Sequence, residues 1–142
     1  MEIIELHSLT DSQTADLLGL MEVLDSTVKV TPEVLKAAAE SAGTHLFAAV
    51  EDGRILGTAS LCVTAHPLGL KGGIEDVVVS PEARGRHIGR LLMEHIIGYA
   101  KENLSPIELH LTSRPEREKA NLLYQAIGFK RHYTNVYKLQ LP

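Results

Sequence analysis

The segment from Ile74 to Tyr99 constrains the fold more than any other part of this sequence. It opens with an apolar β-branched run, Val77–Val79, which is typical of a strand covered on both faces. Ser80-Pro81 follows, and because proline has no N–H group to continue a strand ladder, we predict a turn there. From Ile88 onward, apolar residues recur at helical spacing. The segment therefore predicts a strand, a loop and a helix in direct succession.

The loop between this strand and this helix has the features of an anion-binding site. A helix N-terminus leaves about four backbone N–H groups unpaired and carries roughly half a positive charge. Glycines let the backbone approach a ligand closely, and arginines add fixed positive charge. The sequence thus predicts a cradle for a pyrophosphate, with an ordinary turn and solvated arginines as the alternative. Its residues are Arg84, Gly85, Arg86, His87, Ile88, Gly89 and Arg90.

Two motifs resemble those of the GNAT superfamily of N-acetyltransferases. Residues 84–89 are similar to the R/Q-x-x-G-x-G/A loop that binds the pyrophosphate of coenzyme A, with His87 in place of a glycine. Residues 117–129 resemble the N-x-x-A-x-x-L-Y-x-x-x-G-F segment, with Arg117 in place of the asparagine and Asn121 one turn further on. Both motifs occur in the order that the superfamily has, and the resemblance covers the chain from about residue 45 to its end. The chain is therefore identified as a member of this superfamily.

The resemblance implies an α/β (α+β) fold, the GNAT acyl-CoA N-acyltransferase fold. We expect one domain, residues 1–142, with a central mixed, mostly antiparallel sheet of about seven strands and four flanking helices. Strands are expected at 2–7, 46–50, 55–64, 73–79 and 106–112, with a final hairpin from about 129 to 139. Helices are expected to begin at Thr10 or Asp11, at Thr31, after His87 and at Pro115. This order differs from the regular alternation of a doubly wound sheet.

The resemblance also implies acetyl-CoA as co-substrate and indicates where it binds. Its pantetheine arm pairs with the strand that ends at Val79, like an added strand, and its pyrophosphate meets residues 84–90. In this superfamily the tyrosine of the second motif, here Tyr124, points at the thioester sulfur and donates a proton to the leaving thiolate. Simple packing of the Tyr124 ring beside Leu123 is the alternative. The expected cofactor-binding residues are Val77, Val78, Val79, Arg84, Gly85, Arg86, His87, Ile88, Gly89, Arg90, Asn121 and Tyr124.

The residue that removes the proton from the acceptor amine is harder to assign. Glu75 and Asp76 are adjacent on the expected strand and should point to opposite faces, so only one of them faces a pocket. Glu75 is our first choice for this catalytic base, acting directly or through a water molecule. Orientation of the substrate amine, or an ordinary charge at a strand end, is the alternative role. Glu108 and His110 share a face of the next strand and are weaker candidates.

Composition excludes several other functions and partners. A formal net charge of −4 argues against nucleic acid as a partner, because binding phosphates needs a broad basic face. No apolar run approaches the ~20 residues of a membrane helix, and we see no signal peptide. The one cysteine, Cys62, cannot form an internal disulfide, which fits the cytoplasm, and a small core residue is its expected role. The seven histidines show no metal-ligand spacing, so we expect no metal.

These observations together favour an N-acetyltransferase. We expect it to move an acetyl group from acetyl-CoA to a primary amine of a small molecule, an amino sugar or an amino-acid-like compound. The amine would attack the thioester directly in a ternary complex. A protein or peptide amine as acceptor, or a non-catalytic acyl-CoA-binding regulatory module, is the alternative. A homodimer is an expectation from the fold class alone.

Overall fold

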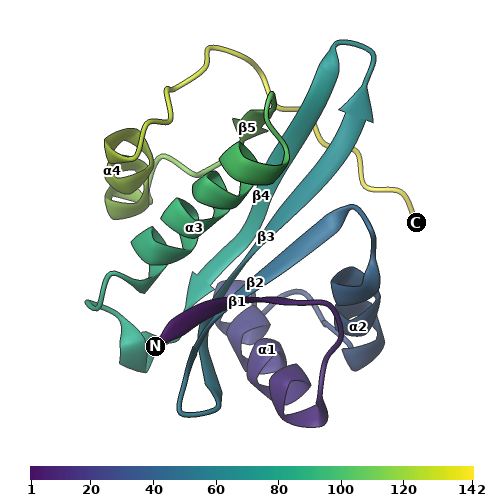
Figure 1. Cartoon of the computed structure of the whole chain (residues 1–142), viewed down its shortest axis with the longest axis vertical. Coiled ribbons are helices and arrows are strands. Elements are labelled where there is room, and N and C mark those ends of the chain that lie inside the picture. Colours follow the sequence, from purple (N-terminus) through teal and green to yellow (C-terminus); the bar gives the residue numbers. More distant parts are fainter. The chain divides into compact units, whose positions relative to one another are not determined.

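A five-stranded sheet in the order β1-β2-β3-β4-β5 forms the centre of the first of two structural units (Figure 1). The computed structural model describes all residues from Met1 to Pro142; the first unit is Met1–Leu111 and the second is Thr112–Pro142. Neighbouring strands pair antiparallel from β1 to β4, whereas β4 and β5 pair parallel. The strands are β1 Glu2–Leu6, β2 Thr44–Glu51, β3 Arg54–His66, β4 Gly69–Val79 and β5 Glu108–His110.

Side-chain caps start the first two helices where the sequence predicted them. α1, Asp11–Leu24, begins with a capping box in which Thr10 Oγ1 accepts a hydrogen bond from the N–H of Gln13 and Gln13 Oε1 accepts one from the N–H of Thr10. α2, Pro32–Glu40, begins after Thr31, whose Oγ1 accepts a hydrogen bond from the N–H of Val34. The remaining helices are α3 Ile88–Asn103, the 3-10 turn η1 Pro81–Ala83, and α4 Glu118–Ala126 in the second unit.

Helices cover both faces of the sheet, and alternate residues of β2 show which helix covers which face. Phe47 packs its ring against His95 and Tyr99 of α3, with ring centroids 5.2 and 5.4 Å apart. Its neighbours Leu46 and Ala48 belong instead to a buried cluster with residues of α1 and α2. Because successive strand residues point to opposite faces, α3 lies on one face and α1 and α2 lie on the other.

A buried carboxylate joins α1 to the start of β3. Asp16 accepts hydrogen bonds from Nε and Nη2 of Arg54, the latter at 2.8 Å, and from the backbone N–H of Ile55 at 3.0 Å. The hydrogen bonds from Arg54 hold the pKa of Asp16 below its ordinary value, against the opposite effect of burial. The Asp16 side chain is only 8% exposed, whereas that of Arg54 is 71% exposed.

Replacing this carboxylate should destabilise the fold in a pH-dependent way. We expect Asp16→Asn to lower the free energy of unfolding by about 1–2 kcal/mol at pH 7, because charge-assisted hydrogen bonds are lost. The folded-state pKa is below the unfolded one, so this contribution is present above the unfolded pKa and disappears as the pH falls through the folded pKa. Urea unfolding at pH 7 and in acid measures both effects, with the exposed Glu22→Gln on α1 as control. Equal stability of the two variants at pH 7 would contradict the expectation.

The C-terminal part of the chain corrects four details of the predicted fold. The sheet has five strands rather than about seven, and residues 129–142 contain no strand where a hairpin was expected. The strand expected at 106–112 is limited to Glu108–His110, and the last helix begins at Glu118 instead of Pro115. An apolar, β-prone segment becomes a strand only when another backbone pairs with it, and local sequence does not specify that partner.

Candidate functional site

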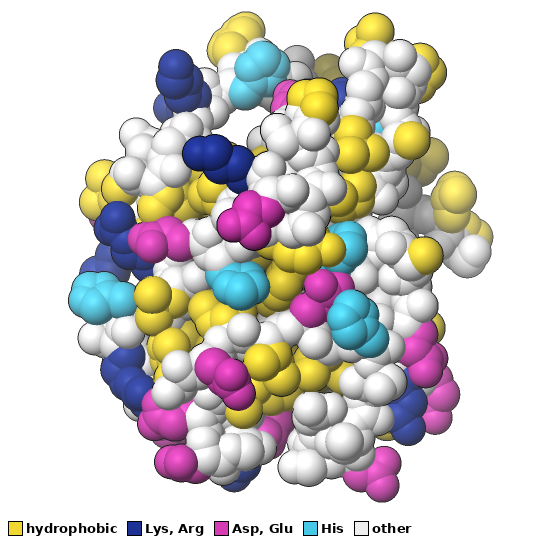
Figure 2. Space-filling model, viewed as in Figure 1, with side chains coloured by type: hydrophobic (Ala, Val, Ile, Leu, Met, Phe, Trp, Pro, Cys, Tyr) yellow, Lys and Arg dark blue, Asp and Glu magenta, His cyan; other side chains and the backbone are white.

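The loop before α3 presents six consecutive backbone N–H groups, those of Gly85 to Arg90, that donate to no acceptor in the structure. The first backbone hydrogen bond after them is donated by the N–H of Leu91 to the carbonyl oxygen of His87, at 3.0 Å. In Figure 2, Lys and Arg side chains gather along the left edge of the view, at the level of the loop that precedes α3 in Figure 1. Free N–H groups at a helix start, surrounded by positive charge, form a binding site for an anion.

Two residues of this loop have left-handed backbone conformations. Gly85 has φ 84°, and no atom would contact a Cβ placed on it within 4 Å. His87, which caps α3, has φ 61° and ψ 24°. Histidine is among the non-glycine residues that occur more often in this region, so His87 takes the conformation that a glycine would otherwise supply.

The three arginines of the loop differ in their partners. Arg86 forms an ion pair with Glu51 and holds the pKa of that carboxyl below its ordinary value. Arg90 forms an ion pair with Glu94, one helical turn further along α3. Arg84 is exposed and forms no ion pair. A bound anion would therefore have to displace an ion-paired carboxylate from Arg86 and from Arg90, but not from Arg84.

Half of β4 has a free edge next to this loop. The parallel ladder joins Lys71–Gly73 to Glu108–His110 and continues no further, so within the first unit Ile74–Val79 pairs only with β3. The free N–H and C=O groups of that edge can pair with an extended ligand in the manner of an added strand. The side chain of Val78 is 7% exposed and lies in the core, so this residue can reach such a ligand through its backbone only.

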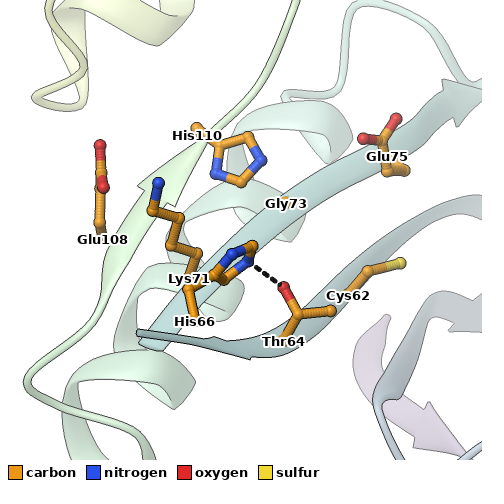
Figure 3. A pocket seen from close by; sticks show the side chains of 8 residues that line it. All are labelled: Cys62, Thr64, His66, Lys71, Gly73, Glu75, Glu108 and His110. Carbon is orange, nitrogen blue, oxygen red and sulfur yellow. Dashed lines mark hydrogen bonds between the residues drawn. The ribbon is translucent and has the colours of Figure 1, made fainter. Parts of the chain in front are cut away.

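The other half of β4 forms the floor of an open pocket of about 430 Å³. Figure 3 shows side chains from three neighbouring strands around it. Strand register explains this grouping, because Gly73 lies opposite Cys62 of β3 on one side and opposite His110 of β5 on the other. The pocket is lined by Cys62, Thr64, His66, Lys71, Gly73, Glu75, Glu108 and His110. The three candidates for the base, Glu75, Glu108 and His110, are thus brought together.

A bulge in β4 separates Glu75 from the residues that follow. Thr58 lies opposite Val78 and Ser60 lies opposite Glu75, so β4 has one more residue than β3 between these pairs. Asp76 has φ 54°, the left-handed conformation typical of a bulge. The regular alternation that we assumed for Glu75 and Asp76 is therefore interrupted between them, and both residues are exposed.

Cys62 lines the pocket and is half-buried, although its expected role was that of a core residue. Burial raises the pKa of its thiol, as do the negative charges of Glu75 and Asp76, while a hydrogen bond with Thr44 acts in the opposite direction. The thiol is therefore protonated at neutral pH. Because the thiolate is the reactive form, Cys62 is poorly suited to act as a nucleophile.

The second unit contains the other two predicted site residues, both on α4. Asn121 Nδ2 donates a hydrogen bond of 3.0 Å to the carbonyl of Arg114, so this side chain fixes the turn before the helix. The ring of Tyr124 meets that of Phe129 edge-on, with centroids 6.4 Å apart, and its hydroxyl has no hydrogen-bond partner. Asn121 and Tyr124 are three residues apart and therefore lie on the same side of α4.

Five lining residues of the pocket escaped the sequence analysis as site residues: Cys62, Thr64, His66, Lys71 and Gly73. Two of these residues, Lys71 and Gly73, could have been found from the sequence. They alternate with Glu75 along one strand and therefore share a face with it. The sequence did not indicate which residues of β3 and β5 lie beside that face. No group of three or more His, Cys, Asp or Glu side chains is arranged to hold a metal ion. None of the helices combines the length and apolar character needed to cross a bilayer.

Comparison with known proteins identifies the family. The sequence profile of the acetyltransferase (GNAT) family matches residues 10–129, which is most of the chain. The chain belongs to the GNAT family. This GNAT protein is 40% identical over 76 residues to an uncharacterized N-acetyltransferase of Schizosaccharomyces pombe. That match covers 52% of this chain and 46% of the yeast protein, so the chain matches about half the length of this curated relative.

Solved structures with the GNAT fold resemble the whole chain. A putative acetyltransferase from Agrobacterium tumefaciens is 23% identical, with a TM-score of 0.84 over 99% of this chain and 100% of that one. An acetyltransferase from Trypanosoma brucei is 28% identical, with a TM-score of 0.76 over 99% of both chains. These similarities support the mixed α/β fold of this GNAT protein.

The residues before α3 fit the group that GNAT proteins generally use, acetyl-CoA. A pyrophosphate carries negative charge on oxygens that accept hydrogen bonds, and the six free N–H groups of Gly85 to Arg90 are donors. The open space above Gly85 and the exposed Arg84 leave room for it. This part of the site is thus compatible with the coenzyme A moiety.

Proposed function

We propose that this chain transfers the acetyl group of acetyl-CoA to a primary amine of a small molecule, an amino sugar or an amino-acid-like compound. The amine attacks the thioester directly, with both substrates bound at once. The observation that carries this proposal is the run of free N–H groups from Gly85 to Arg90, directly after a strand whose outer edge is free. The pocket volume of about 430 Å³ supports a small acceptor, because small-molecule sites are typically ~300–1,000 Å³.

The coenzyme would lie along β4 and the loop. The N–H groups of residues 85–90, with Arg84, Arg86 and Arg90, would hold the pyrophosphate. The backbone of Val77–Val79 would pair with the amides of the pantetheine arm, and Asn121 would offer its Oδ1, which has no partner in the structure. When bound, acetyl-CoA supplies an acetyl thioester, a carbonyl activated toward amines. Since the family profile spans residues 10–129 and so covers parts of both units, we propose that the two units act as one domain.

Acetyl transfer to an amine requires three contributions from side chains and backbone groups of the protein. An alkylammonium with a pKa near ~10.4 must lose a proton before it can attack. Glu75, which lines the pocket, would take that proton directly or through water. A backbone N–H near Val77–Val79 would bind the oxygen on which negative charge develops. The Tyr124 hydroxyl would donate a proton to the leaving thiolate.

Calorimetric titration with acetyl-CoA tests the proposal, with ATP and NAD as controls. We expect acetyl-CoA to bind and the two nucleotides to bind at least about tenfold more weakly, because only acetyl-CoA also pairs with the edge of β4. A panel of small primary amines would then be screened for release of free coenzyme A. Absence of acetyl-CoA binding would refute the enzyme proposal and leave an interaction role for the fold.

A further inference from the structure

The floor of the pocket is a glycine, and two side chains face the space above it. A Cβ built on Gly73 would lie 3.2 Å from Nε2 of His110 and 3.5 Å from Oε1 of Glu75. No hydrogen bond or ion pair joins these two side chains to each other. Figure 3 shows Gly73 between them, with His110 coming from β5 and Glu75 from β4. The polar ends of both side chains therefore lie within 3.5 Å of one point above Gly73, and both line the pocket.

The chemistry of these two groups matches a primary ammonium. An ammonium bound in the pocket between them can donate hydrogen bonds to the carboxylate oxygen and to the imidazole nitrogen. An ammonium has three N–H donors, the carboxylate accepts, and neutral imidazole accepts at Nε2 when its proton is on Nδ1. Of the two groups, imidazole is intrinsically the stronger base.

We propose that Glu75 and His110 bind the ammonium group of the acceptor above Gly73, and that His110 is the base that accepts its proton. This inference rests on the proposed function and divides the role first given to Glu75 between two residues. One proton passes from the ammonium nitrogen to Nε2 of His110, which leaves a neutral amine. The Glu75 carboxylate then stabilises the imidazolium. The second proton, released once the C–N bond has formed, replaces the proton that the Tyr124 hydroxyl gives to the departing thiolate. The imidazolium of His110 then loses its proton to solvent.

The other charged groups on this face modulate the site without replacing it. Lys71 lies two residues from Gly73 on β4, and Glu108 lies opposite Lys71 on β5. His66 is hydrogen-bonded to Thr64, Nε2 to Oγ1, at 2.8 Å. Asp76 adds negative charge near Cys62. The three heavy atoms nearest to a Cβ on Gly73 all belong to Glu75 and His110.

Amine binding can be tested without any turnover. We would titrate the full chain with ethylammonium and follow the NMR signals of the Gly73 amide and the His110 imidazole. Saturable shifts are expected in the wild type and in Gly98→Ala, a glycine of α3 with no atom near its Cβ position. Gly73→Ala and Glu75→Gln should weaken this binding by about tenfold or more, because one fills the space and the other removes the charge. Ethyltrimethylammonium, which has no N–H group, should not bind there.

Proton transfer is tested with two acceptors in the amine screen. His110→Gln should lower kcat/KM for an alkylamine by about 100-fold, the lower range for general-base catalysis. For an arylamine, which is already neutral at pH 7, the same variant should retain most of its activity. His132→Gln, on an exposed residue of the second unit, is the control.

The outcomes separate this inference from the proposed function. Equal ethylammonium binding by the wild type, Gly73→Ala and Glu75→Gln would overturn the amine site, whatever acetyl-CoA does. If His110→Gln lowered kcat/KM equally for the alkylamine and the arylamine, His110 would not be the base. Ethylammonium binding without acetyl-CoA binding would instead leave the amine site standing and refute the acetyltransferase.

Discussion

Tyr124→Phe is expected to lower kcat for acetyl transfer by about 100- to 1,000-fold while leaving the Kd of acetyl-CoA nearly unchanged. Phenylalanine keeps the ring and its edge-on packing with Phe129, so only the hydroxyl is lost. Without a proton donor, the thiolate must leave with its full negative charge, and the barrier for that step rises. Initial rates of coenzyme A release and calorimetry with acetyl-CoA measure the two quantities separately.

The control for this variant is Tyr133→Phe, an exposed tyrosine of the same unit that forms no hydrogen bond in the structure. It should behave as the wild type in both assays. Unchanged turnover in Tyr124→Phe would remove Tyr124 from the mechanism and leave the ring as a packing residue. A large loss of acetyl-CoA affinity would instead indicate that the hydroxyl contributes mainly to binding.

The second large effect is expected from removing two arginines of the loop. Arg84→Ala combined with Arg90→Ala should weaken acetyl-CoA binding by about 10- to 100-fold, because charge-assisted hydrogen bonds to phosphate are lost. Arg84 should account for the larger share, since it has no ion pair to give up, whereas Arg90 must first leave Glu94. Calorimetry at low and high salt measures the acetyl-CoA affinity of the wild type and the double variant. The difference between them should become smaller at high salt, because salt screens these charges.

Lys101→Ala is the control for removing a positive charge far from the loop. Lys101 is exposed in the last turn of α3, the helix that begins with the loop's Arg90 in its first turn. It should bind acetyl-CoA as the wild type does. Equal affinity of the double arginine variant and the wild type would place the pyrophosphate elsewhere. The backbone N–H groups of residues 85–90 would then need a different anion as their ligand.

The strand–loop–helix segment shows how far local sequence carries the prediction. The strand to Val79, the break at Pro81 and the helix from Ile88 all lie where the pattern placed them. His87 departs from the family motif and has a left-handed backbone conformation, with φ 61°. The helix starts at Thr10 and Thr31 were equally predictable, because their capping bonds span three residues.

The candidate site was only partly predictable. Glu75 was the first choice for the base, and Glu108 and His110 were grouped because they share a strand face. The approach of Glu75 and His110 above Gly73 was not foreseen, nor were Cys62 and Lys71 as lining residues. The bulge at Asp76 was also missed, because the residues around it read as an uninterrupted strand.

The sequence by itself determined the features whose interactions close within a few residues: the helix caps, the turn at Pro81 and the basic loop before α3. Tertiary structure alone decided the register that sets Cys62, Gly73 and His110 side by side, the end of the β4–β5 ladder at Gly73, and the number of strands. The physical reason is that a cap joins a side chain to a backbone one turn away, whereas strand pairing uses backbone groups common to all residues except proline. Which strands meet, and in which register, depends on how the whole chain buries its apolar faces.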